Sequence, residues 1–148
     1  MRHPRFLALY ALALVAAAPL AHADVRLPAV VGPHMVLQQQ TEVAVWGFAD
    51  AGEAVTIAPS WSQETWKTKA GADGRFKVMV KTPAAGGPFT IEVKGHNTIR
   101  LDDVLVGEVW LCGGQSNMEW AFAYGGVQNA ETERAAANDA KIRLFDAP

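Results

Sequence analysis

Hydrophobic and polar residues alternate along much of the chain between positions 24 and 103. The clearest case is Arg75–Lys81, in which Phe76, Val78 and Val80 occupy every second position. Because successive side chains of a β-strand point to opposite faces, this pattern predicts a strand with one buried face. Similar patterns predict strands at 42–48, 54–57, 89–93 and 97–101.

Turn-forming residues separate these segments. Ala51–Glu53 contains a central glycine, and Ala72–Gly74 ends in Asp-Gly, a pair that tolerates the positive φ of a hairpin turn. Residues 82–88 are rich in Pro and Gly and predict a loop. Short strands at this spacing are typical of a β-sandwich, which we expect over 24–103.

The pattern changes after Asp103. Val104–Cys112 is an almost continuous apolar run, typical of a strand buried on both faces of a parallel sheet. Residues 116–123 and 130–137 predict helices, and Lys141–Phe145 predicts a further strand. This succession is the opening of an α/β domain. Since one such unit cannot cover both faces of a sheet, we expect the chain to be the N-terminal piece of a longer protein.

The first residues have the features of a secretory signal peptide. Arg2 and Arg5 form a basic start, residues 6–20 are apolar, and residues 21–23 match a small-x-small cleavage site. The apolar stretch is short for a membrane span, so we expect export, to the periplasm or outside the cell, and no membrane association after cleavage. The predicted organisation is a signal peptide at 1–23, a β-sandwich at 24–103 and the incomplete start of an α/β domain at 104–148.

Composition and charge exclude several classes of function. The chain carries 13 basic and 15 acidic residues without a Lys/Arg cluster, so nucleic acid and anionic membrane surfaces are not expected partners. Cys112 is the single cysteine, which rules out an intrachain disulfide, and its place in an apolar run predicts a buried thiol. The sequence shows no spaced cluster of His, Asp or Glu, so we expect no metal and no other cofactor.

Ser116 is the leading candidate for a catalytic residue. It follows Gly113 and Gly114, which give the backbone freedom to expose it, at the predicted start of a helix. There the helix dipole would favour developing negative charge. The nucleophile-elbow pattern G-x-S-x-G is not matched, because Met118 replaces the second glycine. Ser116 also begins an S-x-x-E capping box, in which it would only satisfy backbone amides.

A serine nucleophile needs a base, and the predicted mature chain contains two histidines. His34 lies at an early turn or strand start, and His96 lies in a predicted hairpin turn. We interpret both as solvated or structural side chains and assign neither as the base.

The five tryptophans are many for a chain of 148 residues. Because tryptophan stacks on sugar rings, an alternative function is a non-catalytic carbohydrate-binding β-sandwich in which Ser116 is only a helix cap. The competing interpretation is packing, since tryptophan buries a large area in a small core. Trp120 falls one helical turn after Ser116, near any ligand bound there. The tryptophans are Trp46, Trp61, Trp66, Trp110 and Trp120.

Two blocks of sequence resemble a known family. Gly114–Met118 reads Gly-Gln-Ser-Asn-Met and follows the apolar strand Gly107–Cys112. This block resembles the nucleophile block of the sialate O-acetylesterases and related carbohydrate acetylesterases, which are SGNH hydrolases. The upstream Gly32–Gln39, followed by Val43–Gly47, is similar to the start of the same family. The resemblance covers nearly all of the predicted mature chain.

The resemblance implies a β-sandwich ahead of a flavodoxin-like α/β hydrolase domain. It also implies hydrolysis of an acetyl ester on a sugar, such as sialic acid or a plant-wall polysaccharide. Ser116 would be the nucleophile and its backbone N–H one oxyanion donor. From their position beside Ser116 we expect Gln115, Asn117 and Trp120 to be substrate-binding residues, with Gln115 and Asn117 also shaping the turn. In this family the other oxyanion donors are a Gly and an Asn from later blocks, and the base is a His in an Asp-x-x-His motif. None of these blocks is present here, so we expect the chain alone to be inactive.

Overall fold

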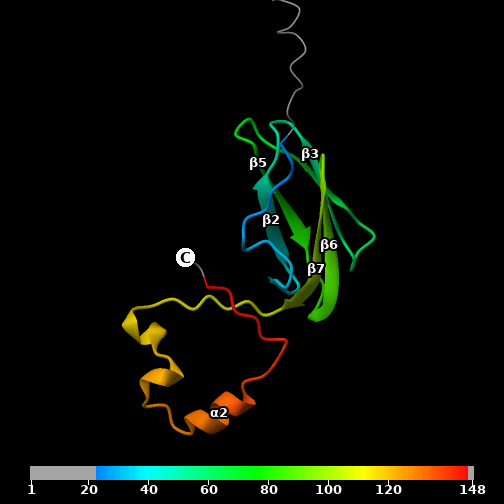
Figure 1. Ribbon diagram of the computed structural model, residues 1–148. Helices are drawn as coiled ribbons and strands as arrows, with labels where there is room; N and C mark the ends of the chain where they lie inside the picture. Colours follow the sequence, from blue (N-terminus) through cyan, green and yellow to red (C-terminus); the bar gives the residue numbers. More distant parts are fainter. Residues whose placement is uncertain (1–22, 147–148) are drawn as a thin grey trace, which may run out of the picture.

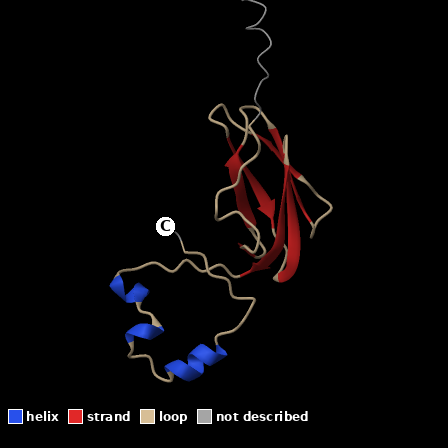
Figure 2. Ribbon diagram, in the orientation of Figure 1, coloured by secondary structure: helices blue, strands red, loops and turns tan. Residues whose placement is uncertain are grey.

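The structure is a computed structural model that describes residues 23–146, and it is mostly β-strand (Figures 1 and 2). The predicted signal peptide, apart from Ala23, lies outside the described residues and stays a prediction. In the described part of the chain no helix has the length and apolar character needed to cross a bilayer. The strands are β1 (Val36–Gln38), β2 (Glu42–Phe48), β3 (Ala54–Pro59), β4 (Trp66–Lys69), β5 (Arg75–Lys81), β6 (Gly86–Lys94) and β7 (Thr98–Gly107); the helices are η1 (Ser116–Glu119), η2 (Phe122–Tyr124) and α2 (Ala130–Ala136).

The strands form two sheets. The larger has the order β1-β7-β6-β3-β4, and the smaller pairs β2 with β5. β1 runs parallel to β7, and the other pairs are antiparallel. The five-stranded sheet curls like half of a barrel, which Figure 2 shows in red. The predicted β-sandwich is therefore confirmed only in its broad outline, as a mostly β fold with two sheets.

Alternation along the strands explains where the core lies. In the pair β2 and β5, Val45 and Val80 are buried, whereas Trp46 faces Lys77 across the pair on the other side. Each Å² of apolar surface that these side chains remove from water stabilises the fold by about 25 cal/mol. The buried side chains of both sheets form one cluster: Val25, Val31, Val45, Ala49, Val55, Ile57, Ala70, Phe76, Val80, Ile91, Val93, Leu101 and Val104.

The predicted strand Val104–Cys112 is confirmed only for residues 104–107 and is wrong for residues 108–112. β7 runs without a break from Thr98 to Gly107, so it joins the predicted strand at 97–101 to the start of the apolar run. After Gly107 the chain leaves the sheet, and Trp110 and Leu111 are 84% and 99% exposed. Among the described residues no neighbouring strand pairs with this part, so its apolar side chains have no layer to pack against. The division into domains at 103/104 stays a prediction.

The helical part differs from the prediction in a similar way. The helix expected at 116–123 is two short 3-10 helices, η1 and η2, and the helix at 130–137 is confirmed as α2. Lys141–Phe145 is not a strand, because no strand of the described chain lies beside it to accept its hydrogen bonds. Cys112 is exposed, so the predicted buried thiol is wrong.

The predicted turns form where glycine allows positive φ. Gly52 and Gly74 have φ of 79° and 72°. The turn at Ala72–Gly74 joins β4 to β5, which lie in different sheets, so it is a connection between sheets and not the hairpin that Asp-Gly predicted. The loop predicted at 82–88 is shorter, since β6 already begins at Gly86.

Candidate active site

Ser116 is the first residue of η1, and it is exposed. The preceding Gln115 has an extended backbone, with φ −95° and ψ −162°, and its carbonyl accepts a hydrogen bond from the Met118 amide at 2.8 Å. Within the described residues the Ser116 hydroxyl has no hydrogen-bond partner. The residue is therefore accessible to a ligand, and no base among residues 23–146 hydrogen-bonds its hydroxyl.

The start of η1 does not have the geometry of a capping box. Its N-cap is Gln115, not Ser116, and that residue makes no side-chain cap hydrogen bond. The prediction that Ser116 caps a helix is therefore wrong in this structure. The helix has four residues, so the dipole effect expected at its start is small.

The neighbours of Ser116 are also exposed. Gln115 and Asn117 are open to solvent, and Trp120 is 59% exposed. The Trp120 indole N–H donates to the carbonyl of Gly125 at 2.9 Å, and its ring meets Tyr124 edge-on with centroids 6.1 Å apart. Contacts with η2 and with the glycine that follows it thus hold the Trp120 ring, and its role toward a substrate stays a prediction.

The two glycines before Ser116 differ. A Cβ at Gly114 would lie 2.5 Å from Met118 Cγ, whereas a Cβ at Gly113 would meet nothing within 4 Å. Neither has positive φ. Close approach to Met118 therefore explains the glycine at 114, and nothing in the structure explains the one at 113.

The structure holds both histidines in contacts with carboxylates. His34 lies in a turn before β1, and its Nδ1 is 2.7 Å from Asp103 Oδ2. His96 lies in the turn between β6 and β7, as predicted, with its Nδ1 3.5 Å from Glu53 Oε2. Neither histidine hydrogen-bonds Ser116 among the described residues, in agreement with leaving the base unassigned.

Sequence reasoning missed two groups of contacts at the ends of the segment that carries Ser116. Glu108, directly after β7, accepts hydrogen bonds from the side-chain amides of Gln38 and Gln39. Hydrogen bonds from Gln38 and Gln39, in that order of effect, hold the pKa of the Glu108 carboxyl below its ordinary range. The partners lie about 70 residues apart in the chain, and no local pattern brings them together.

The other end of this segment returns to Asp103 in β7. The Arg143 guanidinium donates to both carboxylate oxygens of Asp103 at 2.9 Å and to its backbone carbonyl. Hydrogen bonds from His34 and then Arg143, with the positive charge of the arginine, lower the pKa of the Asp103 carboxyl. Nη2 makes both carboxylate contacts and Nη1 donates to the backbone carbonyl, so two nitrogens of the guanidinium hold Asp103.

A third group was also missed by the sequence, and it lies on the sheets. Side-chain atoms of Asp50, Glu53 and His96 lie within 4.8 Å of one another. The buried Glu53 carboxylate accepts backbone N–H groups of Asp50 at 2.9 Å and His96 at 2.6 Å. These bonds join the turn before β3 to the turn after β6, which explains the buried carboxylate as a structural group.

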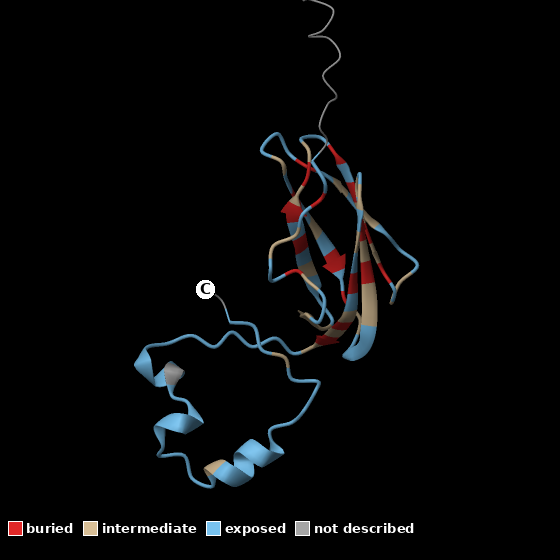
Figure 3. Ribbon diagram, viewed as in Figure 1, coloured by how far each residue is buried: buried red, intermediate tan, exposed pale blue. Residues whose placement is uncertain are grey.

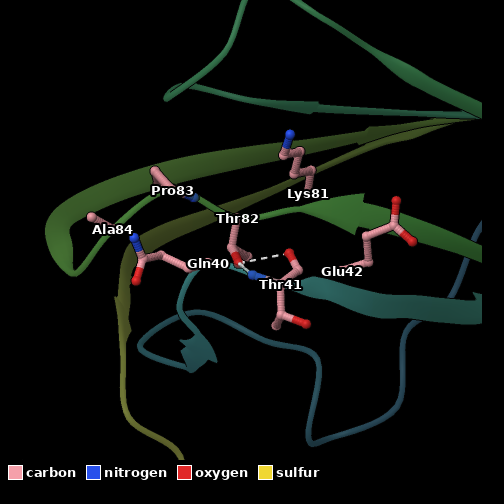
Figure 4. Close-up of a pocket in the computed structure, with 7 residues that line it drawn as sticks. All are labelled: Gln40, Thr41, Glu42, Lys81, Thr82, Pro83 and Ala84. Carbon is pink, nitrogen blue, oxygen red and sulfur yellow. Dashed lines mark hydrogen bonds between the residues drawn. The ribbon is translucent and has the colours of Figure 1, made fainter.

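Two surface depressions lie on the described sheets, and Ser116 lines neither of them. One is lined by residues 40–42 and 81–84. Figure 4 shows Thr82 turned toward Thr41, with a hydrogen bond between them, while the side chains of Lys81 and Glu42 extend in different directions. A second depression is lined partly by Trp61 and Trp66, both of which pack against the core. Polar groups do not converge in the first, so it offers no site for a small ligand.

Comparisons with known proteins identify relatives of most of the chain. No protein-family model matches the chain. The sialate O-acetylesterase of Rattus norvegicus is 35% identical over 131 residues, covering 81% of this chain and 24% of that protein. The sialate O-acetylesterase of Homo sapiens is 38% identical over 105 residues, covering 64% of this chain and 20% of that protein.

A solved structure agrees with these relatives. The crystal structure of a carbohydrate acetylesterase from Xanthomonas citri matches with a TM-score of 0.71 and 37% identity, over 79% of this chain and 26% of that chain. The chain spans about a quarter of the length of the Rattus norvegicus protein and of the Xanthomonas citri protein. In sequence and in structure, this chain is a homologue of the sialate O-acetylesterases and of a carbohydrate acetylesterase.

Proposed function

We propose that this chain, within a protein of family length, contributes the serine nucleophile for hydrolysis of O-acetyl esters on carbohydrates. The observation that carries the proposal is homology to sialate O-acetylesterases and to a carbohydrate acetylesterase over about four fifths of the chain. The exposed hydroxyl of Ser116 supports it, since a nucleophile must reach an ester on a sugar.

The chemistry is acyl transfer in two steps. Ser116 Oγ attacks the acetyl carbonyl while a base takes its proton, and the backbone N–H of Ser116 donates to the oxyanion of the tetrahedral intermediate. The intermediate breaks its bond to the sugar oxygen, which takes the proton from the base, and leaves an acetyl group on Ser116. Water then attacks this ester and releases acetate and the free serine.

The base and the remaining oxyanion donors would come from the rest of the family-length protein. The two histidines of the described chain are not assigned as the base: His34 contacts the Asp103 carboxylate, and His96 contacts the Glu53 carboxylate. In this proposal residues 104–148 begin the SGNH domain, and further strands of that domain cover the exposed Trp110 and Leu111. The acetylated sugar is the expected substrate, with sialic acid as the first candidate.

The test uses the family-length protein, this chain alone and an aryl acetate. We expect the long protein to turn over the ester and to be labelled by a serine-directed fluorophosphonate, with both lost in Ser116→Ala. Ser62→Ala, which removes a hydroxyl in the loop between β3 and β4, is the control and should leave turnover unchanged. Robust Ser116-dependent turnover by this chain alone would show that the missing groups are not needed, and turnover that survives Ser116→Ala would overturn the proposal.

The same experiment decides the alternative of a carbohydrate-binding module. Trp61 is held by an edge contact with Phe89, at 5.4 Å between centroids, and by its indole hydrogen bond to the Lys81 carbonyl at 3.1 Å. These contacts favour packing over sugar stacking for this residue. Binding of saccharides without fluorophosphonate labelling would replace the esterase proposal with the module.

We also propose that the protein is exported, to the periplasm or beyond. The basic and apolar start of the sequence and the Ala-His-Ala site at 21–23 support this. Mass spectrometry of the secreted or periplasmic protein should find Asp24 at the N-terminus, and an intact Met1 would contradict it.

A further inference from the structure

The segment that carries Ser116, residues 109–142, has almost no packing of its own; we call it the Ser116 segment. Among its described side chains only Ala130 is even partly buried, and the segment is pale blue throughout its loops in Figure 3. Its helices η1, η2 and α2 hydrogen-bond within themselves and their own neighbours. The position of Ser116 relative to the sheets therefore depends on how the ends of the segment are held.

The first end is held by what we call the first anchor, formed by Gln38, Gln39 and Glu108. The Gln38 amide donates to Glu108 Oε2 at 2.9 Å, and the Gln39 amide donates to Oε1 at 2.7 Å. The Gln38 side-chain oxygen accepts the Val109 backbone N–H at 2.9 Å. One pair of glutamines thus fixes the carboxylate and the first amide of the Ser116 segment together.

The second end is held by what we call the second anchor, formed by His34, Asp103 and Arg143. Arg143 is largely buried, with 20% of its side chain exposed, although its neighbours Ile142 and Leu144 are 71% and 95% exposed. The contacts of its Nη2 with both carboxylate oxygens of Asp103 bring the chain back beside β7.

Two residues of the second anchor have a constrained backbone conformation. His34 and Asp103 both adopt left-handed conformations, with φ of 65° and 56°. Such conformations cost energy for residues other than glycine and tend to occur where a functional geometry requires them. Asp103, which pairs with Arg143, and His34, which pairs with Asp103, are therefore both held in left-handed conformations by the surrounding fold.

Three of the six residues that form the two anchors come from one block of sequence. His34, Gln38 and Gln39 lie in Gly32–Gln39, the upstream block that resembles the acetylesterase family. β1, within this block, is the parallel neighbour of β7, so it lies directly beside the strand from which the Ser116 segment leaves. This block has no other role in the chemistry proposed for Ser116.

We propose that Gly32–Gln39 is a positioning device that pins both ends of the Ser116 segment to the sheets and thereby sets where the nucleophile stands. The positioning residues are Gln38, Gln39 and Glu108 at the first anchor and His34, Asp103 and Arg143 at the second. The inference rests on the proposed function of Ser116, because positioning matters only if Ser116 reacts. Fixing two ends of a loop narrows the positions of every residue between them.

Trypsin tests the second anchor in this chain. Trypsin must take the arginine side chain into its own pocket, so cleavage after Arg143 requires release from Asp103. We expect Asp103→Asn to speed cleavage after Arg143 about tenfold relative to cleavage after the exposed Arg134, as for loss of one hydrogen bond to a charged group. Asparagine tolerates left-handed φ, so the turn is kept.

The control for this experiment is Asp102→Asn. It removes the same charge one residue away, where the carboxylate pairs with Arg100, and should leave the cleavage ratio unchanged. Equal ratios in Asp103→Asn and the unaltered chain, with unchanged thermal unfolding of the sheets, would overturn the second anchor.

Amide hydrogen exchange of Val109, followed by NMR, tests the first anchor. In Glu108→Gln the new side-chain NH₂ can face the Gln39 amide, donor against donor, and we expect Val109 to exchange several-fold faster. Gln39→Glu combined with Glu108→Gln reverses donor and acceptor, and should restore slow exchange. Glu64→Gln, an exposed change away from the segment, is the control. Fast exchange in the double variant, or no change in Glu108→Gln, would overturn the first anchor.

Kinetics of the family-length protein distinguish anchors that position Ser116 from anchors that only stabilise the fold. For an aryl acetate we expect Asp103→Asn and Glu108→Gln to lower kcat with little change in KM, and the Gln39→Glu and Glu108→Gln combination to recover kcat. If Ser116→Ala abolishes turnover but the anchor variants keep the unaltered kcat, the positioning role is wrong, while Ser116 remains the proposed nucleophile. If Ser116→Ala has no effect, the proposed function fails, and positioning fails with it.

Discussion

The two sheets and the Ser116 segment both contain many apolar residues, but the sheets bury theirs and the segment exposes most of its own. Ile57 and Ile91 in the sheets are fully buried, whereas Leu111, just before the Ser116 motif, is 99% exposed. The sheet residues lie in strands whose neighbours cover them, while the segment has no partner strand among the described residues. The difference shows that an apolar run is buried only where a neighbouring strand or sheet packs against it.

The largest effect that would test this comparison is a cavity in the sheets. Ile91→Ala removes buried atoms from β6, and we expect a loss of about 2–5 kcal/mol in the free energy of unfolding. Leu111→Ala is the matched change in the exposed region and should alter stability by no more than about 0.5 kcal/mol. Urea unfolding followed by tryptophan fluorescence measures both. A similar loss in the two variants would mean that Leu111 is packed in solution.

A smaller effect sharpens the comparison at a buried polar group of the sheets. The Thr82 hydroxyl, in a residue 4% exposed, lies 2.7 Å from the Gln38 carbonyl and 2.9 Å from the Thr41 carbonyl, and it accepts the Thr41 amide at 3.2 Å. Thr82→Val keeps the shape and leaves these groups unpaired.

We expect Thr82→Val to cost about 1–3 kcal/mol, the penalty for burying an unsatisfied polar group. Urea unfolding measures the loss, and Thr65→Val, at an exposed loop position, is the control. A neutral result for Thr82→Val would mean that water replaces the hydroxyl there.

The smallest effect concerns the pH dependence of the anchors. The pKa of Asp103 and that of Glu108 are lowered, so the folded state favours their ionised forms. Their stabilisation is present above the ordinary carboxyl pKa of about 4 and is lost as pH falls through the lowered values. Both anchors should therefore be formed at neutral pH and loosen in acid.

NMR titration of the side-chain carboxyl carbons checks this expectation. Both midpoints should lie below the ordinary values, and His34→Ala should move the Asp103 midpoint upward, since the His34 hydrogen bond is the largest cause of its shift. An Asp103 midpoint that does not change in His34→Ala would separate the histidine from the second anchor.

Strands whose signal is local were predicted well. The bounds expected for β2 and β5, 42–48 and 75–81, are those of the structure. Both follow from alternation, which depends only on residues next to one another in the chain. The apolar run at 104–112 had a local pattern of equal strength, but a strand buried on both faces needs neighbours, and the pattern cannot say whether they are present.

The candidate site divides in the same way. Ser116, Gln115 and Asn117 were found because they are contiguous and form a motif, and the structure exposes all three. The anchors were not found, because Gln38 and Glu108 meet across 70 residues of chain. The only signal for them was that Gly32–Gln39 carries part of the family resemblance without an evident purpose.

The sequence by itself determined the β-rich character, the alternating strands, the turns at Gly52 and Gly74 and the kinship with carbohydrate acetylesterases. Each depends on residue types at short spacing, where covalent geometry and side-chain chemistry act directly. Only the tertiary structure decided that β1 lies beside β7, that Gln39 meets Glu108 and that Arg143 returns to Asp103. Those contacts depend on how strands pair across the whole chain, which is set by packing of the complete core.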